Sequence, residues 1–229
     1  MSKVLGITLA RGGSKGVKDK NIREVGGKPL LVWTIEQALE ATLDDYVVST
    51  DSARIAAVAR RYGAKVIMRP DELATDASPS IDALIHALDM SERAFKTEYD
   101  IVADIRNTNP LKTAEDIDGA VDKLIRTGAD CVAGCTRLED HHPSRIKMIV
   151  GDRLVPVWPE PEGGNRQDLT PDCYIRNGSI YAVRVAALRE GVFFLGGVTR
   201  PWLMPIERSI NIDTELDLMV CDVLLTARK

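Results

Sequence analysis

Two patterns of apolar residues alternate along the first 136 positions of the chain. Continuous apolar runs are typical of strands buried on both faces, whereas apolar residues at helical spacing indicate helices. The runs predict strands at 3–10, 45–50, 64–68, 100–105 and 130–136, and the spacings predict helices between them, including one at 80–95. This alternation predicts an α/β fold with a doubly wound, mostly parallel sheet in a single domain, residues 1–229.

Residues that favour helix ends mark several of the predicted helices. Pro29 stands where a helix opens, and proline is tolerated at a first helical position. Ser52 is a candidate N-cap of the next helix. Thr113 and Asp116 form a capping-box pattern ahead of a helix that closes at Gly128. These signals agree with the helix boundaries that the apolar pattern predicts.

The alternation ends at residues 138–172, which are rich in proline and glycine. Two short β-like pieces flank a turn at Gly151–Asp152. We interpret this segment as an excursion from the core, either an inserted lid or an oligomerisation arm. A strand returns at 173–183, and the chain then leads into a final amphipathic helix. The apolar residues taken to define that helix are Leu216, Val220, Val223 and Leu224.

Composition indicates an ordinary soluble protein. The 229 residues are 45% hydrophobic and 28% charged, with a formal net charge of -4 at pH 7. This mild acidity argues against a broad surface for nucleic acid or membranes. No apolar run approaches the roughly 20 residues that cross a bilayer, and the N-terminal run lacks a signal-peptide cleavage region. We therefore expect a cytoplasmic protein with no nucleic-acid or membrane partner.

The chain has four cysteines, which we interpret as reduced thiols of a cytosolic protein. The spacing of Cys131 and Cys135 resembles that of one pair of zinc ligands. Because no second pair follows and both lie in a strand-like run, a zinc site is disfavoured.

The most unusual stretch is "LARGGSKGVKDKNIR", residues 9–23, which we call the glycine loop. It holds five cationic side chains and one acidic residue. Such crowding is repulsive unless an anion neutralises it. Ligands of doubly wound sheets bind beyond the carboxyl ends of the strands, and this loop directly follows the first strand. An anionic ligand is therefore expected here, with a solvated basic turn as the alternative. The cations are Arg11, Lys15, Lys18, Lys20 and Arg23.

The glycine loop matches neither common nucleotide motif. It lacks the Walker spacing and the G-x-G-x-x-G spacing of dinucleotide sites, although Asp51 after the second strand keeps a dehydrogenase open as a distant alternative. Gly12, Gly13 and Gly16 let backbone N–H groups approach a phosphate, and Ser14 adds a hydroxyl. Arginine offers forked contacts and lysine a mobile point charge. The loop therefore predicts phosphate binding.

Long segments of the chain resemble one family. They include "LARGGSKGVKDKNIREVGGKPLLVWTIEQA", "VVSTDSARIAAVARRYGAKV", "RPDELATDASPSIDALIHAL", "NTNPLKTAEDID", "HHPSRIK", "NRQDLTPDCYIRNGSIYAV" and "ERSINIDTELDL". Together they cover nearly the whole chain in order. They are similar to the nucleotide-sugar pyrophosphorylases, and within them to the acylneuraminate cytidylyltransferases, or CMP-sialic acid synthetases.

The resemblance implies a nucleotide-diphospho-sugar transferase fold and a defined reaction. The anomeric hydroxyl of an acidic nine-carbon sugar attacks the α-phosphorus of CTP, and pyrophosphate leaves. Such a transfer depends on in-line positioning and charge neutralisation. Mg²⁺ is the implied cofactor. A homodimer is the implied assembly, in which the arm at 138–172 reaches over the partner's active site.

The resemblance also assigns nucleotide-binding residues. It implies that Arg11, Ser14, Lys15 and Lys20 hold the triphosphate together with the backbone of Gly12 and Gly13. Asn21 lies near the ribose or a phosphate, Arg69 reaches the β- and γ-phosphates, and Ser80 lies in the nucleotide wall. For Arg69 a structural strand-end role remains open.

Two departures concern the metal and the sugar. The family more often shows two alternating aspartates where this chain has Asn211 and Asp213, which would face one cleft. Asp213 alternatively caps the last helix. Asp104, an acid in an apolar strand, either pairs with Arg106 or helps to hold the metal.

The second departure is "RNTNP", where common members show Gln-Pro-Thr-Ser-Pro. Some relatives that act on flagellin-type nonulosonic acids look closer here, and GTP remains an alternative to CTP. A 3-deoxy-manno-octulosonate substrate and a catalytically impaired nucleotide-binding homologue also remain open. No general base stands out, and adjacent His141 and His142 would point apart. The residues that match sugar-pocket segments are Arg106, Thr108, Asn109, Arg166, Gln167 and Asn177.

Overall fold

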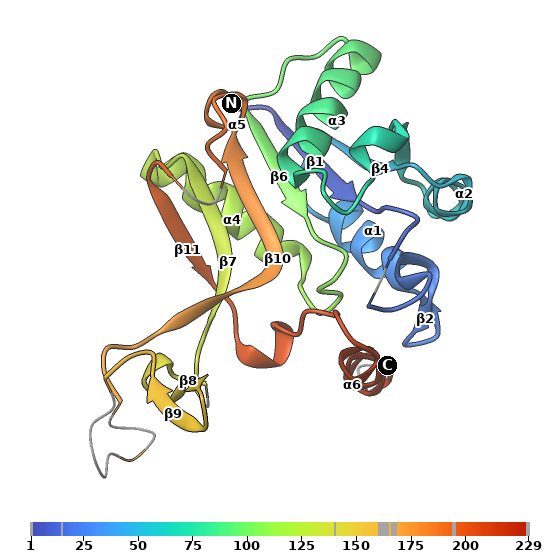
Figure 1. Cartoon of the computed structure of the whole chain (residues 1–229). Helices are drawn as coiled ribbons and strands as arrows, with labels where there is room; N and C mark the ends of the chain where they lie inside the picture. Colours follow the sequence, from blue (N-terminus) through green and yellow to red (C-terminus); the bar gives the residue numbers. More distant parts are fainter. Residues whose placement is uncertain are drawn as a thin grey trace.

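A seven-stranded sheet forms the centre of the protein (Figure 1). The computed structural model describes residues 2–14, 16–139, 141–159, 165, 169–193 and 196–227. In sheet order the strands are β11 (Thr199–Leu203), β7 (Cys131–Arg137), β10 (Tyr174–Arg184), β6 (Ile101–Ile105), β1 (Val4–Leu9), β4 (Asp45–Thr50) and β5 (Lys65–Met68). Only β10 runs antiparallel to its neighbours within this sheet. The predicted mostly parallel α/β sheet is confirmed.

Helices cover both faces of the sheet (Figure 1). Leu31 of α1, Ile55 of α2 and Leu124 of α4 belong to the buried cluster on one face. Leu84 of α3 and Leu188 of α5 belong to the cluster on the other. Continuous apolar strands such as β1 therefore lie between two cores, as expected of doubly wound sheets. The bounds are α1 (Leu30–Glu40), α2 (Ala53–Arg61), α3 (Ser80–Phe95), α4 (Ala114–Thr127), α5 (Val185–Arg189) and α6 (Glu215–Thr226).

The predicted helix ends hold with one shift. The Ser52 side chain accepts a hydrogen bond from the Ile55 N–H group. Thr113 and Asp116 form the predicted capping box, and Gly128 closes α4 in the left-handed conformation at φ 66°. Pro29 is the N-cap of α1 and not its first helical residue, because it ends the short strand β3 (Lys28–Pro29), which pairs with β2 (Glu24–Val25).

The order of strands determines where a ligand binds. The chain passes from β1 to β4 and β5 on one side, and then returns to β6 on the other side of β1. The loops that follow β1 and β6 therefore diverge at their carboxyl ends and leave a crevice at this switch point. The glycine loop follows β1, and residues 106–109 follow β6. The "RNTNP" departure and the cationic loop thus meet at the carboxyl ends of neighbouring strands.

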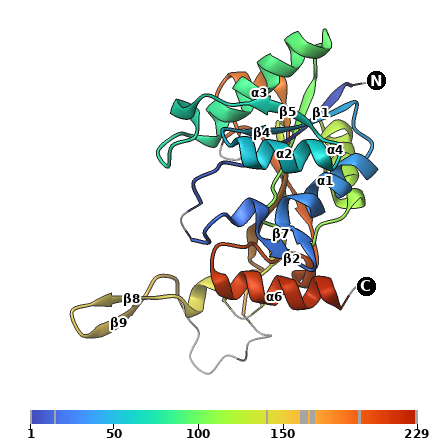
Figure 2. The ribbon, with the colours of Figure 1, turned by 90° about the vertical axis from the view of Figure 1, so that its right-hand side faces the viewer.

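Between β7 and β10 the chain leaves the sheet. A 3₁₀ turn at Pro143–Arg145 leads into a two-stranded hairpin of β8 (Lys147–Val150) and β9 (Arg153–Pro156). Figure 2 shows this hairpin projecting away from the body of the protein, at the same end as α6. Ile149 and Leu154 are 77% and 73% exposed. The segment predicted as an arm thus contains an extended hairpin with apolar side chains on its surface.

The apolar side of α6 was predicted wrongly for Leu216, Val220 and Val223, whereas the predicted Leu224 does pack against the core. Leu218, Cys221 and Leu225 are buried against the core, whereas Leu216 and Val223 are 65% and 67% exposed. Apolar residues surround much of this helix, so the periodicity of the sequence did not identify the face that packs. Within the described residues, no helix combines the length and apolar character needed to span a membrane.

Candidate active site

A cavity of about 420 Å³ lies at the switch point of the sheet. The glycine loop forms one part of its wall, the segment after β5 a second, and residues 106–108 after β6 a third. Asp213, far along the chain, joins them. The polar and charged lining residues are Arg11, Ser14, Lys20, Asn21, Arg69, Thr75, Asp76, Ser78, Ser80, Arg106, Asn107, Thr108 and Asp213. The loop that predicted an anion site therefore opens onto a cavity with residues from three strand ends.

The glycine loop is tied to the end of β4 through Asp51. Its Oδ1 accepts a hydrogen bond from the Gly12 N–H group at 3.0 Å and lies 3.7 Å from an Nη atom of Arg69. Burial lowers the pKa of Arg69, while Asp51 opposes this effect. The carboxylate that a dehydrogenase would use for a ribose is therefore engaged inside the wall. Arg69 is almost fully buried there and lines the cavity.

The glycines of the loop differ in what they require. A Cβ at Gly16 would lie 2.2 Å from the backbone oxygen of Asp213, and one at Gly12 would lie 3.2 Å from Asp51 Oδ2. At Gly13, no described atom beyond its chain neighbours lies within 4 Å. Gly16 thus allows the C-terminal segment to pass directly beside the loop.

Three polar side chains of the loop have definite partners. An Nη atom of Arg11 lies 2.7 Å from Asp76 Oδ1. Lys20, which opens a 3₁₀ turn, donates to the carbonyl of Ile212 at 2.6 Å and lies 3.5 Å from Asp213 Oδ1. Asn21 donates to the backbone oxygen of Arg11 at 2.7 Å. The loop cations therefore stand close to carboxylates at the cavity, where an anionic ligand competes for them.

Lys15, Arg166 and Gln167, which the sequence assigned to phosphate and sugar binding, lie outside the described residues.

Asn211 and Asp213 are in contact, but of this pair, which was predicted to face one cleft, only Asp213 lines the cavity. Asn211 Nδ2 donates to Asp213 Oδ2 at 2.5 Å, and the Asp213 side chain is 68% exposed at the cavity. Asp213 does not cap α6. Thr214 is the N-cap and shares a capping box with Asp217, so the capping alternative is wrong. In the described part of the chain no cluster of three or more histidine, cysteine, aspartate or glutamate residues is suited to hold a metal.

Asp104 pairs with Arg106, so the structure supports the first of the two roles considered for Asp104, ion pairing rather than metal binding. The Arg106 Nε–H group donates to Asp104 Oδ2 at 2.6 Å, and Asp104 is fully buried. Burial raises the pKa of Asp104, and the charges of Arg106 and Lys112 oppose this effect. The Arg106 guanidinium lies 5.4 Å from the ring of Tyr181. Arg106 lines the cavity and Asp104 does not, so Asp104 holds Arg106 from behind.

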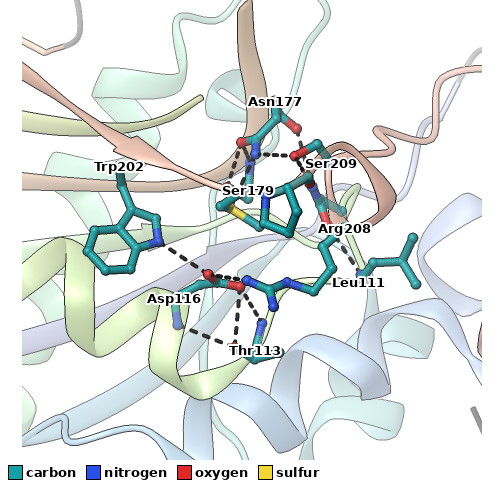
Figure 3. Close-up of polar contacts among 11 residues, drawn as sticks. Leu111, Thr113, Asp116, Asn177, Ser179, Trp202, Arg208 and Ser209 are labelled. Atoms are coloured by element: carbon teal, nitrogen blue, oxygen red, sulfur yellow. Dashed lines mark hydrogen bonds and ion pairs between the residues drawn. The ribbon is translucent and has the colours of Figure 1, made fainter. Parts of the chain in front are cut away.

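Asn109 and Asn177 lie behind the cavity wall. Asn109 is fully buried, accepts from the Leu111 N–H group at 3.2 Å and donates to the Asn177 carbonyl at 3.4 Å. Asn177 donates to Ser209 Oγ at 2.9 Å and accepts from Ser179 Oγ at 2.6 Å (Figure 3). Thr108, between these contacts and Arg106, does line the cavity. The two asparagines therefore connect β10 with the segment that leads to Asp213.

The same segment is also held at α4 by contacts that sequence reasoning missed. Asp116 of the capping box accepts from an Nη–H group of Arg208 at 2.8 Å and from Trp202 Nε1 at 3.2 Å (Figure 3). The capping-box pattern showed one function of Asp116. The pattern gave no sign that Asp116 also binds Arg208, because Arg208 lies 92 residues further along the chain.

His141 and His142 face different surroundings, as expected for adjacent residues. His142 is buried, and its Nε2 lies 2.9 Å from the Pro171 carbonyl, which can only accept a hydrogen bond. Its Nδ1 lies 2.8 Å from Ser144 Oγ. His141 is exposed. Since neither lines the cavity, both ring nitrogens of His142 act in packing the base of the arm.

Comparisons with known proteins identify the family. The family model described as "Cytidylyltransferase" matches residues 5–145. A CMP-N,N'-diacetyllegionaminic acid synthase of Legionella pneumophila is 35% identical, over 97% of this chain and 96% of that protein. An N-acylneuraminate cytidylyltransferase of Escherichia coli is 33% identical over 94% of this chain, which spans only 50% of that longer protein.

A solved structure supports the same fold. It is a CMP:2-keto-3-deoxy-manno-octonic acid synthetase complexed with CTP, which aligns over 100% of both chains with a TM-score of 0.75 at 20% identity. At this identity the likeness concerns the fold alone. The expected nucleotidyltransferase fold is confirmed, and so is the family resemblance. The chain belongs to the cytidylyltransferase family, with acylneuraminate and legionaminate cytidylyltransferases among its relatives, and it is a nucleotidyltransferase.

Proposed function

We propose that this protein transfers CMP from CTP to the anomeric hydroxyl of an acidic nine-carbon sugar of the sialic or legionaminic type. The anomeric oxygen forms a bond to the α-phosphorus, and the bond from that phosphorus to the leaving pyrophosphate oxygen breaks. The observation that carries the proposal is the cavity in which the glycine loop faces Asp213 and Arg106. The names of the relatives supply the base and the class of sugar.

The triphosphate is assigned to the glycine loop. Arg11 and Lys20 already contact carboxylates at 2.7 Å and 3.5 Å, so phosphate oxygens replace partners that are also anionic oxygen acceptors. Ser14 and Lys15 add further donors beside the backbone of Gly12 and Gly13. Such contacts neutralise charge on the leaving pyrophosphate, which is the main requirement of phosphoryl transfer.

The nucleoside is assigned to the adjoining wall of the cavity, which holds Asn21, Arg69 and Ser80. Arg69 is buried with its Nε atom unpaired among the described residues, so it is a fixed group and not a mobile surface cation.

Asp213 and Asn211 are the residues that would hold Mg²⁺. Magnesium is often bound by one or two carboxylates together with substrate phosphates and water. The exposed Asp213 carboxylate next to the proposed phosphate site fits this pattern, and Asn211 holds that carboxylate through its Nδ2 group. The ion would supply charge neutralisation at the phosphates. Lys20, which donates to the Ile212 carbonyl, holds this segment against the glycine loop.

The sugar carboxylate is assigned to Arg106. Its Nε–H group is occupied by Asp104, which leaves the two Nη groups at the cavity for a forked contact with a carboxylate. Thr108 adds a hydroxyl to the same wall. Asn109 and Asn177 act behind it, and Arg166 and Gln167, which lie outside the described residues, are assigned to sugar binding from the sequence alone.

We further propose a C₂ homodimer in which the arm of each copy extends toward the partner. The exposed apolar side chains of β8 and β9 support this proposal, because such surfaces mark interfaces. In sedimentation the wild type is expected to be a dimer, and the double variant Ile149→Asp with Leu154→Asp is expected to be a monomer. A monomeric wild type would refute the dimer. Four free thiols favour the reducing cytoplasm as the site of action.

Pyrophosphate release tests the reaction directly. Purified protein is given CTP or GTP with Mg²⁺, and each of sialic acid, a legionaminic acid and 3-deoxy-manno-octulosonate. Release that requires CTP and a nine-carbon acid supports the proposal. Release with GTP or with the eight-carbon acid identifies one of the alternatives. CTP binding without release from any acceptor identifies a nucleotide-binding protein that has lost catalysis, which Asn211 in place of aspartate favours.

A further inference from the structure

Among the described residues Lys112 is the largest that is fully buried, and nothing in the reaction assigned above uses it. It follows the 106–109 loop by three residues. Its Nζ donates to the carbonyl of Arg106 at 2.7 Å, the carbonyl of Asn109 at 2.8 Å and Thr34 Oγ1 at 2.8 Å. An ammonium group has three hydrogens, so every one of them has an acceptor.

Two of these acceptors are the two ends of the 106–109 loop. Residues 106, 107 and 108 line the cavity, while residue 109 lies behind it. A single nitrogen thus binds both carbonyls that bracket the cavity-lining residues. This loop lies between β6, which ends at Ile105, and α4, which begins at Ala114, and a backbone hydrogen bond from the Arg106 N–H group to the Ser179 carbonyl of β10 at 2.9 Å ties only its start to the sheet. The lysine replaces the main-chain donors that a regular element would provide.

The anchored loop in turn contacts two other parts of the site. The carbonyl of Thr108 accepts from the Ile212 N–H group at 2.7 Å, next to Asp213. Asn107 Nδ2 donates to Asn21 Oδ1 in the glycine loop. A shift of the loop would therefore change the positions of Arg106 and of the Asp213 segment together.

We propose that Lys112 is a positioning residue that holds the 106–109 loop, so that Arg106 meets the sugar carboxylate and the Asp213 segment stays beside the glycine loop. The substrate part of this inference rests on the proposed function. The positioning part rests only on the contacts of the folded chain.

The contacts explain why a lysine is retained at this buried place. Burying a charged amine is costly unless its hydrogens are paired. Asp116 on α4 and Asp104 on β6 are the charged groups that interact with it, and burial still lowers the pKa of Lys112 to about 7. The loop contacts do not depend on the charge. A neutral amine keeps two hydrogens for the two carbonyls, since the Thr34 hydroxyl then donates to Nζ.

Lys112→Met is the test variant, because methionine fills similar space without donors. Thr34→Val is the matched control, which removes the third acceptor and leaves both loop contacts. Three measurements are compared with wild type: amide hydrogen exchange of residues 106–112, calorimetric binding of CTP with Mg²⁺, and KM for the acidic sugar in pyrophosphate release.

For Lys112→Met we expect exchange of residues 106–112 to quicken and KM for the sugar to rise by about tenfold. CTP affinity should change less, by under about threefold, because Lys20 still ties the Asp213 segment to the glycine loop. Thr34→Val should match wild type in exchange and change KM by less than about twofold. Wild-type exchange and KM in Lys112→Met would overturn the proposal, as would equal effects from Thr34→Val.

If Lys112→Met does not fold, Lys112→Gln, which keeps two N–H donors, is measured in the same way. Recovery of slow exchange in this variant supports the proposal, and exchange as fast as in an unstructured loop overturns it. The readouts separate the two proposals. Absence of pyrophosphate release from the wild type with every acid refutes the proposed substrate, whereas the exchange data still decide whether Lys112 holds the loop.

Discussion

The glycine loop and the 106–109 loop line the same cavity, but they present their chemistry differently. The glycine loop carries Arg11 and Lys20 with their charged groups at the surface of the cavity, paired to carboxylates that a ligand can replace. In the 106–109 loop only Arg106, Asn107 and Thr108 reach the cavity.

The groups that hold the second loop are buried. Asp104 and Lys112 are fully enclosed, and each supports the loop from beneath. The difference teaches that a phosphate site depends on charges that are visible in a sequence. A sugar site depends on rigid placement of a few groups, and the residues that provide it lie out of contact with the ligand.

The largest effect is expected at the junction of the two loops with the C-terminal segment. Asp213→Ala should lower kcat by about a thousandfold, the size of effect found when one charge-stabilising contact is removed. It should also weaken the dependence of the rate on Mg²⁺ concentration. Steady-state pyrophosphate release over a Mg²⁺ series measures both.

Glu215→Gln is the control, because Glu215 lies two residues away and pairs with Arg23 at 3.2 Å on the surface. Exposed pairs contribute about 0–1 kcal/mol, so this change should leave the rate within about twofold. Equal losses of kcat in the two variants would show that the rate depends on the integrity of this segment and not on the Asp213 carboxylate.

The second prediction tests whether the 106–109 loop depends on its buried acid. Arg106→Met should raise KM for the sugar by about a hundredfold through loss of a forked ionic contact. It should also lower the free energy of unfolding by about 3 kcal/mol, because it leaves Asp104 buried without its partner. Urea unfolding and pyrophosphate release are measured on the same preparations.

The double variant Asp104→Asn with Arg106→Met separates these two effects. Removing the buried acid should recover most of the lost stability, whereas KM should remain high. If the double variant regains sugar binding, Arg106 is not the partner of the carboxylate.

The third prediction compares two glycines of the glycine loop. Gly16→Ala should lower the free energy of unfolding by about 2 kcal/mol, since its Cβ would lie 2.2 Å from the Asp213 backbone oxygen. In Gly13→Ala the Cβ enters open space among the described atoms, so stability should change by less than about 0.5 kcal/mol. Thermal unfolding without ligand checks both, and equal stabilities would contradict the close approach of the two segments.

The sheet was predictable from the sequence because its signals are local. Continuous apolar runs marked five strands of the central sheet, and Thr113 with Asp116 marked the start of α4. The buried face of α6 was not predictable, because apolar residues occur on most sides of that helix. Which of them are buried, among them Leu218 and Leu225, depends on tertiary packing. Strand β11 was missed because its sequence, TRPWL, contains a proline and no continuous apolar run, and helix α5 was missed because it has only five residues.

The candidate site divides in the same way. The anion site of the glycine loop and the adjacency of Asn211 and Asp213 followed from residue types and spacing. The burial of Asn177 could not be predicted from residue types and spacing. The register of β10 shifts between Arg176 and Tyr181, and the Asn177 side chain there points toward Ser209. Lys112 gave no clear sequence signal either, since its acceptors are backbone carbonyls and Thr34, which lies 78 residues away.

The smallest effect is a pH dependence of stability that originates in Lys112. Burial lowers its pKa from 10.5 to about 7 in the folded protein, so between these values the unfolded chain binds more protons than the folded one. Stability must therefore rise as pH rises through this window. From pH 7 to 8.5 the gain should be about 1.5 kcal/mol. Above pH 9 the buried thiols of Cys131 and Cys221, whose pKa values burial raises to about 12, act in the opposite direction. Urea unfolding at pH 7, 7.75 and 8.5 should show the rise in wild type and its absence in Lys112→Met, and an equal slope in both would assign it to another group.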